Sequence, residues 1–158
     1  MEQVGFGGGC HWCTEAVFQA IRGVHKVEQG WIKSSAIYSE GIWVHYDPAV
    51  VTLKQLIEIH LDTHSSQSKH SLREKYRSAV YYISHSQEGL IQTTLNVIVS
   101  ERKQSFVTEV LPMECFTLNK EEYLNYYENK KNAPFSKTYI QPKLNILSKK
   151  YRTILKDQ

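Results

Sequence analysis

The chain has 158 residues and a formal net charge of +3, with 41% hydrophobic and 22% charged residues. This length supports one hydrophobic core, so we expect a single domain over residues 1–158. The charge is too small to indicate nucleic-acid binding, and no apolar run approaches the ~20 residues of a membrane span. The N-terminus lacks the basic and apolar regions of a signal peptide, so we expect a cytoplasmic protein. Three cysteines, an odd number, indicate catalysis, metal binding or burial rather than a disulfide framework.

Strand-like and helical segments occur in mixed order along the first half of the chain. Residues 3–6 have strand character and lead into a helical pattern, and alternation then predicts strands over 24–32 and 37–46. Within the last of these, Ile42, Val44 and Tyr46 fall on one face and Trp43 and His45 on the other. Thr52-Leu53-Lys54-Gln55 matches a capping box, and the helix that follows it is the clearest in the chain.

The second half of the chain begins with a polar stretch over residues 65–75, which we interpret as a loop. The further predicted elements are a strand over 77–83, a helix from Ser86 to Ile98, a strand over 106–111, a short helix around 121–127 and a helical tail over 143–156. Because strands and helices mix without strict alternation, we predict an α+β sandwich built around one sheet.

A glycine-rich turn delivers a cysteine to the start of the first helix. Gly7-Gly8-Gly9 permits backbone conformations with positive φ, and Cys10 follows directly. Unpaired N–H groups and the positive end of the helix dipole stabilise an anion at that position. A thiolate is such an anion, so we predict a lowered pKa for Cys10 and interpret it as a nucleophile.

The stretch around Cys10 resembles the signature of the methionine sulfoxide reductase A family, in which Gly-Cys-Phe-Trp is usual. The matching residues here are Gly8-Gly9-Cys10-His11-Trp12-Cys13-Thr14-Glu15-Ala16. Further matches follow in the same order as in the family: Gly23-Val24, Gly30-Trp31, Glu40, Tyr46-Asp47-Pro48, Tyr76-Arg77-Ser78-Ala79 and Glu121-Glu122-Tyr123. The resemblance implies a two-layer sandwich with a mixed, mainly antiparallel sheet flanked by helices and a ferredoxin-like core.

The resemblance also implies a reaction, the thiol-dependent reduction of methionine S-sulfoxide, free or in peptides, without a bound cofactor. Cys10 would attack the sulfoxide sulfur, Glu40 would donate a proton to the departing oxygen, and Tyr76 would donate a hydrogen bond to that oxygen. Cys10 would then be a sulfenic acid, which a second thiol converts to a disulfide. The implied partner is thioredoxin, which reduces the disulfide of what we expect to be a monomer.

The expected substrate pocket departs from the family pattern at several positions. Trp12 is retained and would pack on the methyl group of the substrate. His11 replaces the usual phenylalanine, and Trp31 stands where a second tyrosine is expected. Ser71 occupies the place of a substrate-contacting aspartate, and Lys75 stands where glutamine is usual. We therefore expect a pocket lined by His11, Trp12, Trp31 and Ser71.

Two cysteines are candidates for the second thiol. Cys13 has the spacing of known redox dithiols relative to Cys10, and a small buried residue on the first helical turn is the alternative interpretation. Cys115 qualifies only if the fold brings its Cα within about 7 Å of that of Cys10, and simple burial is again the alternative. No cysteine follows Cys115, so the C-terminal recycling cysteine of many family members is absent from this sequence.

Two other functions compete with sulfoxide reduction. In one, the altered pocket shifts the substrate to another sulfoxide or to a peroxide, with Cys10–Cys13 as the working disulfide. In the other, Cys10, His11 and Cys13 form a metal-binding module with a distant histidine, His64 or His70. Elemental analysis separates the second alternative from the first, because only a metal module retains stoichiometric zinc or copper.

Overall fold

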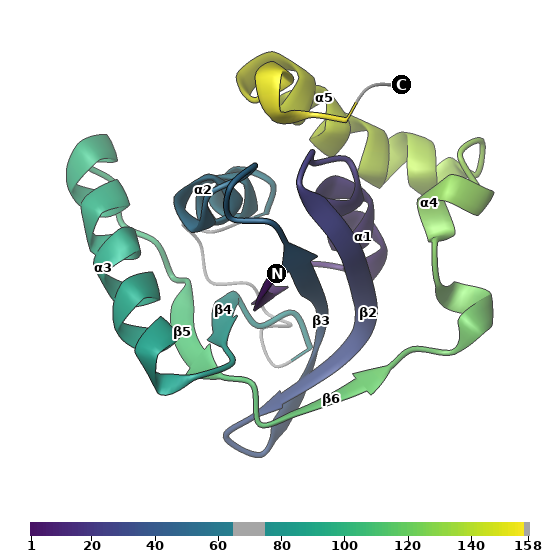
Figure 1. Cartoon of the computed structure of the whole chain (residues 1–158). Helices are drawn as coiled ribbons and strands as arrows, with labels where there is room; N and C mark the ends of the chain where they lie inside the picture. Colours follow the sequence, from purple (N-terminus) through teal and green to yellow (C-terminus); the bar gives the residue numbers. More distant parts are fainter. Residues whose placement is uncertain (65–74, 157–158) are drawn as a thin grey trace.

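The structure, a computed structural model, describes residues 1–64 and 75–156, which form a six-stranded sheet covered by helices (Figure 1). The strands are β1 (Glu2–Gly7), β2 (Val24–Ser34), β3 (Ile37–Tyr46), β4 (Ala79–Tyr82), β5 (Glu109–Pro112) and β6 (Cys115–Leu118). Their order across the sheet is β5-β4-β1-β3-β2-β6. Among these strands β4 and β5 pair in parallel and all other neighbours pair antiparallel. The predicted α+β class with a mixed, mainly antiparallel sheet is therefore confirmed.

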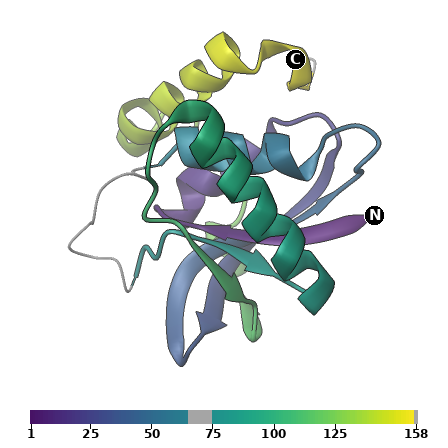
Figure 2. The ribbon, with the colours of Figure 1, turned by 90° about the vertical axis from the view of Figure 1, so that its left-hand side faces the viewer.

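The helices are α1 (His11–Gln19), α2 (Leu53–Asp62), α3 (His85–Arg102), α4 (Tyr126–Asn129) and α5 (Gln141–Lys150). Figure 2 shows α3 running across the molecule beside the sheet. The predicted capping box opens α2, because the Thr52 hydroxyl accepts a hydrogen bond from the Gln55 N–H and the Gln55 side chain accepts one from the Thr52 N–H. Among the described residues, no helix combines the length and the apolar character needed to cross a membrane.

The main hydrophobic core lies between the sheet and the helices. In β3 the side chains of Ile42, Val44 and Tyr46 are fully buried in this core, whereas Trp43 and His45 between them are half-buried, as the period of two predicts. The rings of Phe6 on β1 and Phe18 on α1 stack with centroids 4.7 Å apart. This stacking fixes α1, and with it Cys10, against the centre of the sheet.

Several predicted boundaries differ from the structure. Strand β6 was not predicted, because its four residues form a short, largely exposed edge strand with a weak apolar pattern. The strand expected over 106–111 begins at Glu109, and the helix expected around 121–127 divides into a 3₁₀ turn, Glu121–Tyr123, and α4. The tail helix expected over 143–156 ends at Lys150, and the turn Arg152–Ile154 follows.

Candidate active site

Cys10 occupies the N-cap position of α1, where the glycine-rich turn meets the helix. Its carbonyl oxygen accepts the N–H groups of Cys13 and Thr14, each at 3.1 Å, which begins the helical hydrogen-bond pattern. Gly8 has φ +147°, and a Cβ at that position would lie 2.5 Å from the ring of His64. Position 8 therefore requires glycine, both because of its positive φ and because a Cβ would collide with the His64 ring.

The thiols of Cys10 and Cys13 have opposite tendencies to ionise. A hydrogen bond from the Cys13 thiol lowers the pKa of Cys10, and the N–H groups of Trp12 and Cys13 act in the same direction against burial and the charge of Glu40. The same hydrogen bond raises the pKa of Cys13, and burial raises it further. Cys10 is therefore the more readily ionised of the two thiols, and Cys13 stays protonated beside it, which is the arrangement that a nucleophile with an adjacent second thiol requires.

Glu40 is a buried carboxyl group on β3 that is fixed by two neighbouring segments. The His11 N–H donates to Glu40 Oε1 at 3.1 Å, and Lys75 Nζ lies 3.4 Å from Oε2. The Glu40 N–H in turn donates to the Lys75 carbonyl oxygen at 2.8 Å. The Lys75 ammonium also lies 5.2 Å from the centre of the Tyr76 ring. One connected set of contacts thus joins the Cys10 helix start, Glu40 and Tyr76.

His11 is a neutral imidazole clamped between distant segments. Burial lowers its pKa, against the charge of Glu40 and the carbonyl of Gly30, which favour the proton. The Asn119 amide nitrogen lies 3.2 Å from His11 Nε2 and can only donate, so Nε2 accepts and Nδ1 carries the hydrogen. Nδ1 then points at the Gly30 carbonyl oxygen, 3.3 Å away. The His11 ring packs edge-on against the Trp31 ring, with centroids 5.6 Å apart.

Trp12 belongs to an aromatic cluster contributed by the C-terminal third of the chain. Its ring stacks on Tyr126 with centroids 4.0 Å apart. The Phe135 ring lies perpendicular to it, with centroids 5.4 Å apart. Its indole nitrogen is buried and has no hydrogen-bond partner among the described residues. Sequence reasoning placed Trp12 in the pocket but missed Tyr126 and Phe135, because their stretches carry no periodic signal that ties them to α1.

Other predicted site residues are placed less centrally. Ser71 lies outside the described residues, as does His70. Cys115 is exposed at the start of β6, where it pairs with Lys33. Lys143 of α5, which no sequence pattern singled out, lines a small cavity together with Cys13.

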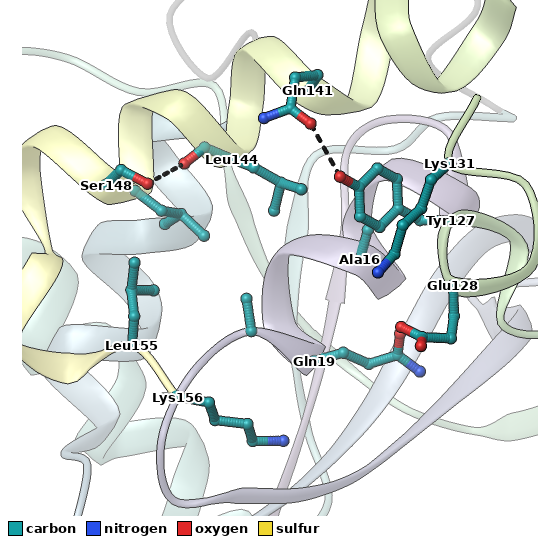
Figure 3. A pocket seen from close by; sticks show the side chains of 12 residues that line it. Ala16, Gln19, Tyr127, Glu128, Lys131, Gln141, Leu144, Ser148, Leu155 and Lys156 are labelled. Atoms are coloured by element: carbon teal, nitrogen blue, oxygen red, sulfur yellow. Dashed lines mark hydrogen bonds between the residues drawn. The ribbon is translucent and has the colours of Figure 1, made fainter. Parts of the chain in front are cut away.

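A cavity of about 590 Å³ lies between α1, α4 and α5 (Figure 3). Ala16 of α1 and Ala20, which follows that helix, are among the lining residues, and the Tyr127 hydroxyl donates to Gln141 Oε1 at 2.8 Å (Figure 3). Cys10 is not among the described residues that line this cavity. The cavity is therefore separate from the thiol site.

The metal-binding alternative is not favoured. Within residues 1–64 and 75–156, no group of three or more histidine, cysteine, aspartate or glutamate side chains is placed to hold an ion. His64, one of the proposed distant ligands, instead has its Nε2 atom 2.7 Å from the Ser78 hydroxyl.

A two-layer α+β fold that presents a cysteine of lowered pKa at a helix start, beside a second cysteine and a buried carboxyl group, is typical of a thiol-based redox enzyme. Residues 2–155 match the sequence profile described as "Peptide methionine sulfoxide reductase". The chain belongs to this family, as the residues around Cys10 predicted.

Relatives agree with this assignment, and solved structures share the fold. Peptide methionine sulfoxide reductase MsrA from Acinetobacter baumannii (strain SDF) is 30% identical across the whole of both chains. The protein of the same name from Sulfolobus acidocaldarius is 28% identical over 96% of each chain. Methionine sulfoxide reductase A of Corynebacterium diphtheriae has a similar fold, with TM-score 0.70 and 19% identity over 84% of this chain and 76% of that one. Mxr1 from Saccharomyces cerevisiae in reduced form also has a similar fold, with TM-score 0.66 and 18% identity over 84% of this chain and 87% of that one.

Proposed function

We propose that this protein is a peptide-methionine (S)-S-oxide reductase that uses Cys10 as its nucleophile. The observation that carries the proposal is the position of Cys10 at the start of α1, where the Cys13 thiol and the N–H groups of the first turn lower its pKa. The next residue, His11, donates its N–H to the buried carboxyl group of Glu40. Family membership supplies the substrate class, methionine sulfoxide in peptides or free. The retained Cys10, Glu40 and Tyr76 supply the three groups that the reaction needs.

The reaction begins when the Cys10 thiolate attacks the sulfoxide sulfur. The carboxyl group of Glu40 gives a proton to the sulfoxide oxygen, and the Tyr76 hydroxyl donates a hydrogen bond as negative charge develops there. The oxygen then transfers to the Cys10 sulfur, which leaves methionine and a sulfenic acid. The sulfoxide sulfur is reduced by two electrons, and the Cys10 sulfur is oxidised by two.

The substrate side chain lies against Trp12, His11 and Trp31 in this proposal. Trp12 offers an apolar ring whose orientation is fixed by its stacking on Tyr126. His11 is neutral and already hydrogen-bonded at both ring nitrogens, so it lines the pocket without adding a charge. Ser71 is the fourth proposed lining residue.

We further propose that Cys13 converts the sulfenic acid to a disulfide and that thioredoxin reduces this disulfide. The hydrogen bond between the two thiols brings Cys13 next to Cys10. Mxr1 from Saccharomyces cerevisiae has been solved in complex with Trx2, and that chain shares this fold with a TM-score of 0.60 at 18% identity, over 77% of this chain and 82% of that one. We also propose that the protein works as a monomer in the cytoplasm, a reducing compartment in which an exposed thiol such as that of Cys115 stays free.

Steady-state assays of single-cysteine variants test the proposal. The native protein should convert N-acetylmethionine S-sulfoxide to the thioether with dithiothreitol or thioredoxin as reductant. Cys10→Ser should lower kcat by at least ~10³-fold, because it removes the nucleophile. Cys115→Ser is the matched control and should leave kcat unchanged, since this side chain is exposed on β6. Absence of product from the native protein, or a Cys10→Ser variant that keeps its activity, would contradict the proposal.

A further inference from the structure

Lys143 brings a positive charge to the cysteine pair, and the reaction proposed above does not use it. This residue lies on the first turn of α5 and is half-buried. Its ammonium donates a hydrogen bond to the carbonyl oxygen of Thr63 at the end of α2. A cavity of about 10 Å³, room for roughly one water, is lined by Lys143 and Cys13 together with Gly8, Gly9 and Thr14 of the active-site turn.

The electrostatic partners of Lys143 are the two active-site sulfurs. Burial lowers the pKa of Lys143, while the charge of Cys13, followed by that of Cys10, raises it. Lys143 in turn favours ionisation of Cys13, against the effects of burial and Glu40. Since the influence of Cys13 on Lys143 exceeds that of Cys10, the ammonium acts mainly on Cys13.

Oxidation of Cys10 changes this balance. In the reduced protein, the hydrogen bond to the Cys10 thiolate is the largest effect that keeps Cys13 protonated, and the negative charge of Cys10 adds to it. A sulfenic acid at Cys10 is uncharged, so both effects disappear once the substrate has been reduced. Burial and Glu40 still oppose a Cys13 thiolate, and Lys143 is the cation that favours it.

We propose that Lys143 is a positioning residue for the second step of the reaction, in which its ammonium stabilises the Cys13 thiolate that attacks the sulfenic acid of Cys10. This inference rests on the proposed function, because it requires a sulfenic acid at Cys10. In the step, the S–O bond of Cys10 breaks and the Cys10–Cys13 disulfide forms. The departing hydroxide takes up the proton that the Cys13 thiol has lost and leaves as water.

Other groups that face Lys143 are already engaged in hydrogen bonds. His60 of α2 and His64, two residues after the end of α2, line the same cavity. His60 Nε2 lies 2.6 Å from the Gly7 carbonyl oxygen, and His64 Nε2 pairs with the Ser78 hydroxyl. The alternative role for Lys143 is purely structural, as a cap for the C-terminal carbonyl of α2. The experiment must therefore separate the charge of Lys143 from its hydrogen bond.

Single-turnover kinetics of charge variants make this separation. Reduced protein is mixed with excess N-acetylmethionine S-sulfoxide without reductant, then quenched and analysed for methionine product and for the Cys10–Cys13 disulfide. Lys143→Gln keeps a donor for the Thr63 carbonyl but removes the charge, and Lys143→Arg keeps the charge. Lys149→Gln removes an exposed lysine from the same helix and serves as the matched control.

We expect Lys143→Gln to slow disulfide formation by about tenfold, since a change of one unit in the pKa of a thiol changes its thiolate fraction tenfold. The pH dependence of this step should move to higher pH, because the thiolate is less stable without the ammonium. The yield and rate of methionine formation should change by less than about threefold. Lys143→Arg should restore the disulfide rate to near the native value, and Lys149→Gln should not change it.

Two outcomes would overturn the inference. One is a Lys143→Gln variant whose disulfide rate and pH profile match those of the native protein. The other is an equal slowing of both steps that Lys143→Arg does not rescue, which indicates a structural cap alone. Failure of the proposed function looks different, because the native protein would then release no equivalent of methionine.

Discussion

At the scale of single residues, His11 links the stability of this protein to pH. Burial keeps its imidazole neutral in the folded state, so its folded pKa lies below its unfolded value of about 6.5. Below that pH the unfolded chain binds a proton that the folded chain does not. The free energy of unfolding therefore falls as the pH drops from about 6.5 toward the folded pKa, and His11 causes no such loss above this window.

Replacement of the His11 side chain should weaken the dependence of the free energy of unfolding on pH below about pH 6.5. We expect His11→Phe to reduce the loss of unfolding free energy between pH 6.5 and pH 5 by at most about 2 kcal/mol, the value for one proton over that interval. Urea denaturation at a series of pH values measures the slope. His85→Asn is the control, because the His85 side chain is 97% exposed and should leave the slope unchanged. An unaltered slope in His11→Phe would show that another group is responsible.

The functional residues that could be predicted are those whose determinants lie close together in the chain. Cys10 could be predicted because its glycine-rich turn and its helix are neighbours in the chain. The clamp on His11 could not, because its partners Gly30 and Asn119 lie 19 and 108 residues away in the sequence. Lys143 was missed for a different reason: a lysine in a helical tail is usually a solvated surface residue.

At the scale of elements, the edge strand β6 depends on a glycine in its neighbour β2. Gly30 pairs with Leu118 in this ladder, and a Cβ at Gly30 would collide with the carbonyl oxygen of Thr117. Since the obstacle is backbone, β6 itself must move away from β2. Asn119 follows directly after β6 and donates to both His11 and Gln29, so the displacement would also loosen the clamp on His11.

We therefore expect Gly30→Ala to lower the free energy of unfolding by about 1–3 kcal/mol, as overpacking of a fixed site does. The KM for the sulfoxide should rise as well, because the pocket residue His11 loses its support. Gly89→Ala is the matched control: it lies inside α3 with no other atom within 4 Å of the added Cβ and should stabilise by up to about 1 kcal/mol. Chemical denaturation of both variants checks the contrast. Equal stability of the two variants would mean that β6 does not need this close approach.

Local chemistry predicted some elements well and others poorly. The start of α2 followed from its capping box and the two faces of β3 from their alternation, because both signals lie within one segment. Strand β6 and the division of the 121–127 region depend on what packs beside them. Asn125 and Tyr126 donate their N–H groups to the buried Glu15 of α1, which holds that segment where its own sequence does not specify a continuous helix.

At the scale of the whole molecule, the site exists only when distant parts of the chain have come together. Cys10, Glu40 and Tyr76 come from a helix start, the middle of a strand and the approach to another strand. The aromatic cluster and Lys143 come from the last third of the sequence. Figure 1 shows α4 and α3 on opposite sides of the molecule, with α1 and α2 between them. Substitutions in α3 should therefore affect the site only through the stability of the fold.

Ile98 on α3 tests this separation of stability from catalysis. Its side chain is fully buried in the main core, so Ile98→Ala removes apolar contacts and leaves a cavity that should cost about 2–5 kcal/mol of unfolding free energy. Val97 is the adjacent control, because it is 42% exposed and Val97→Ala should change stability by less than about 1 kcal/mol. At a temperature where circular dichroism shows both variants fully folded, kcat and KM should equal the native values. A lowered kcat in folded Ile98→Ala would mean instead that α3 is coupled to the cysteine pair through the core, by way of α2 and the His60 side chain that contacts the active-site turn.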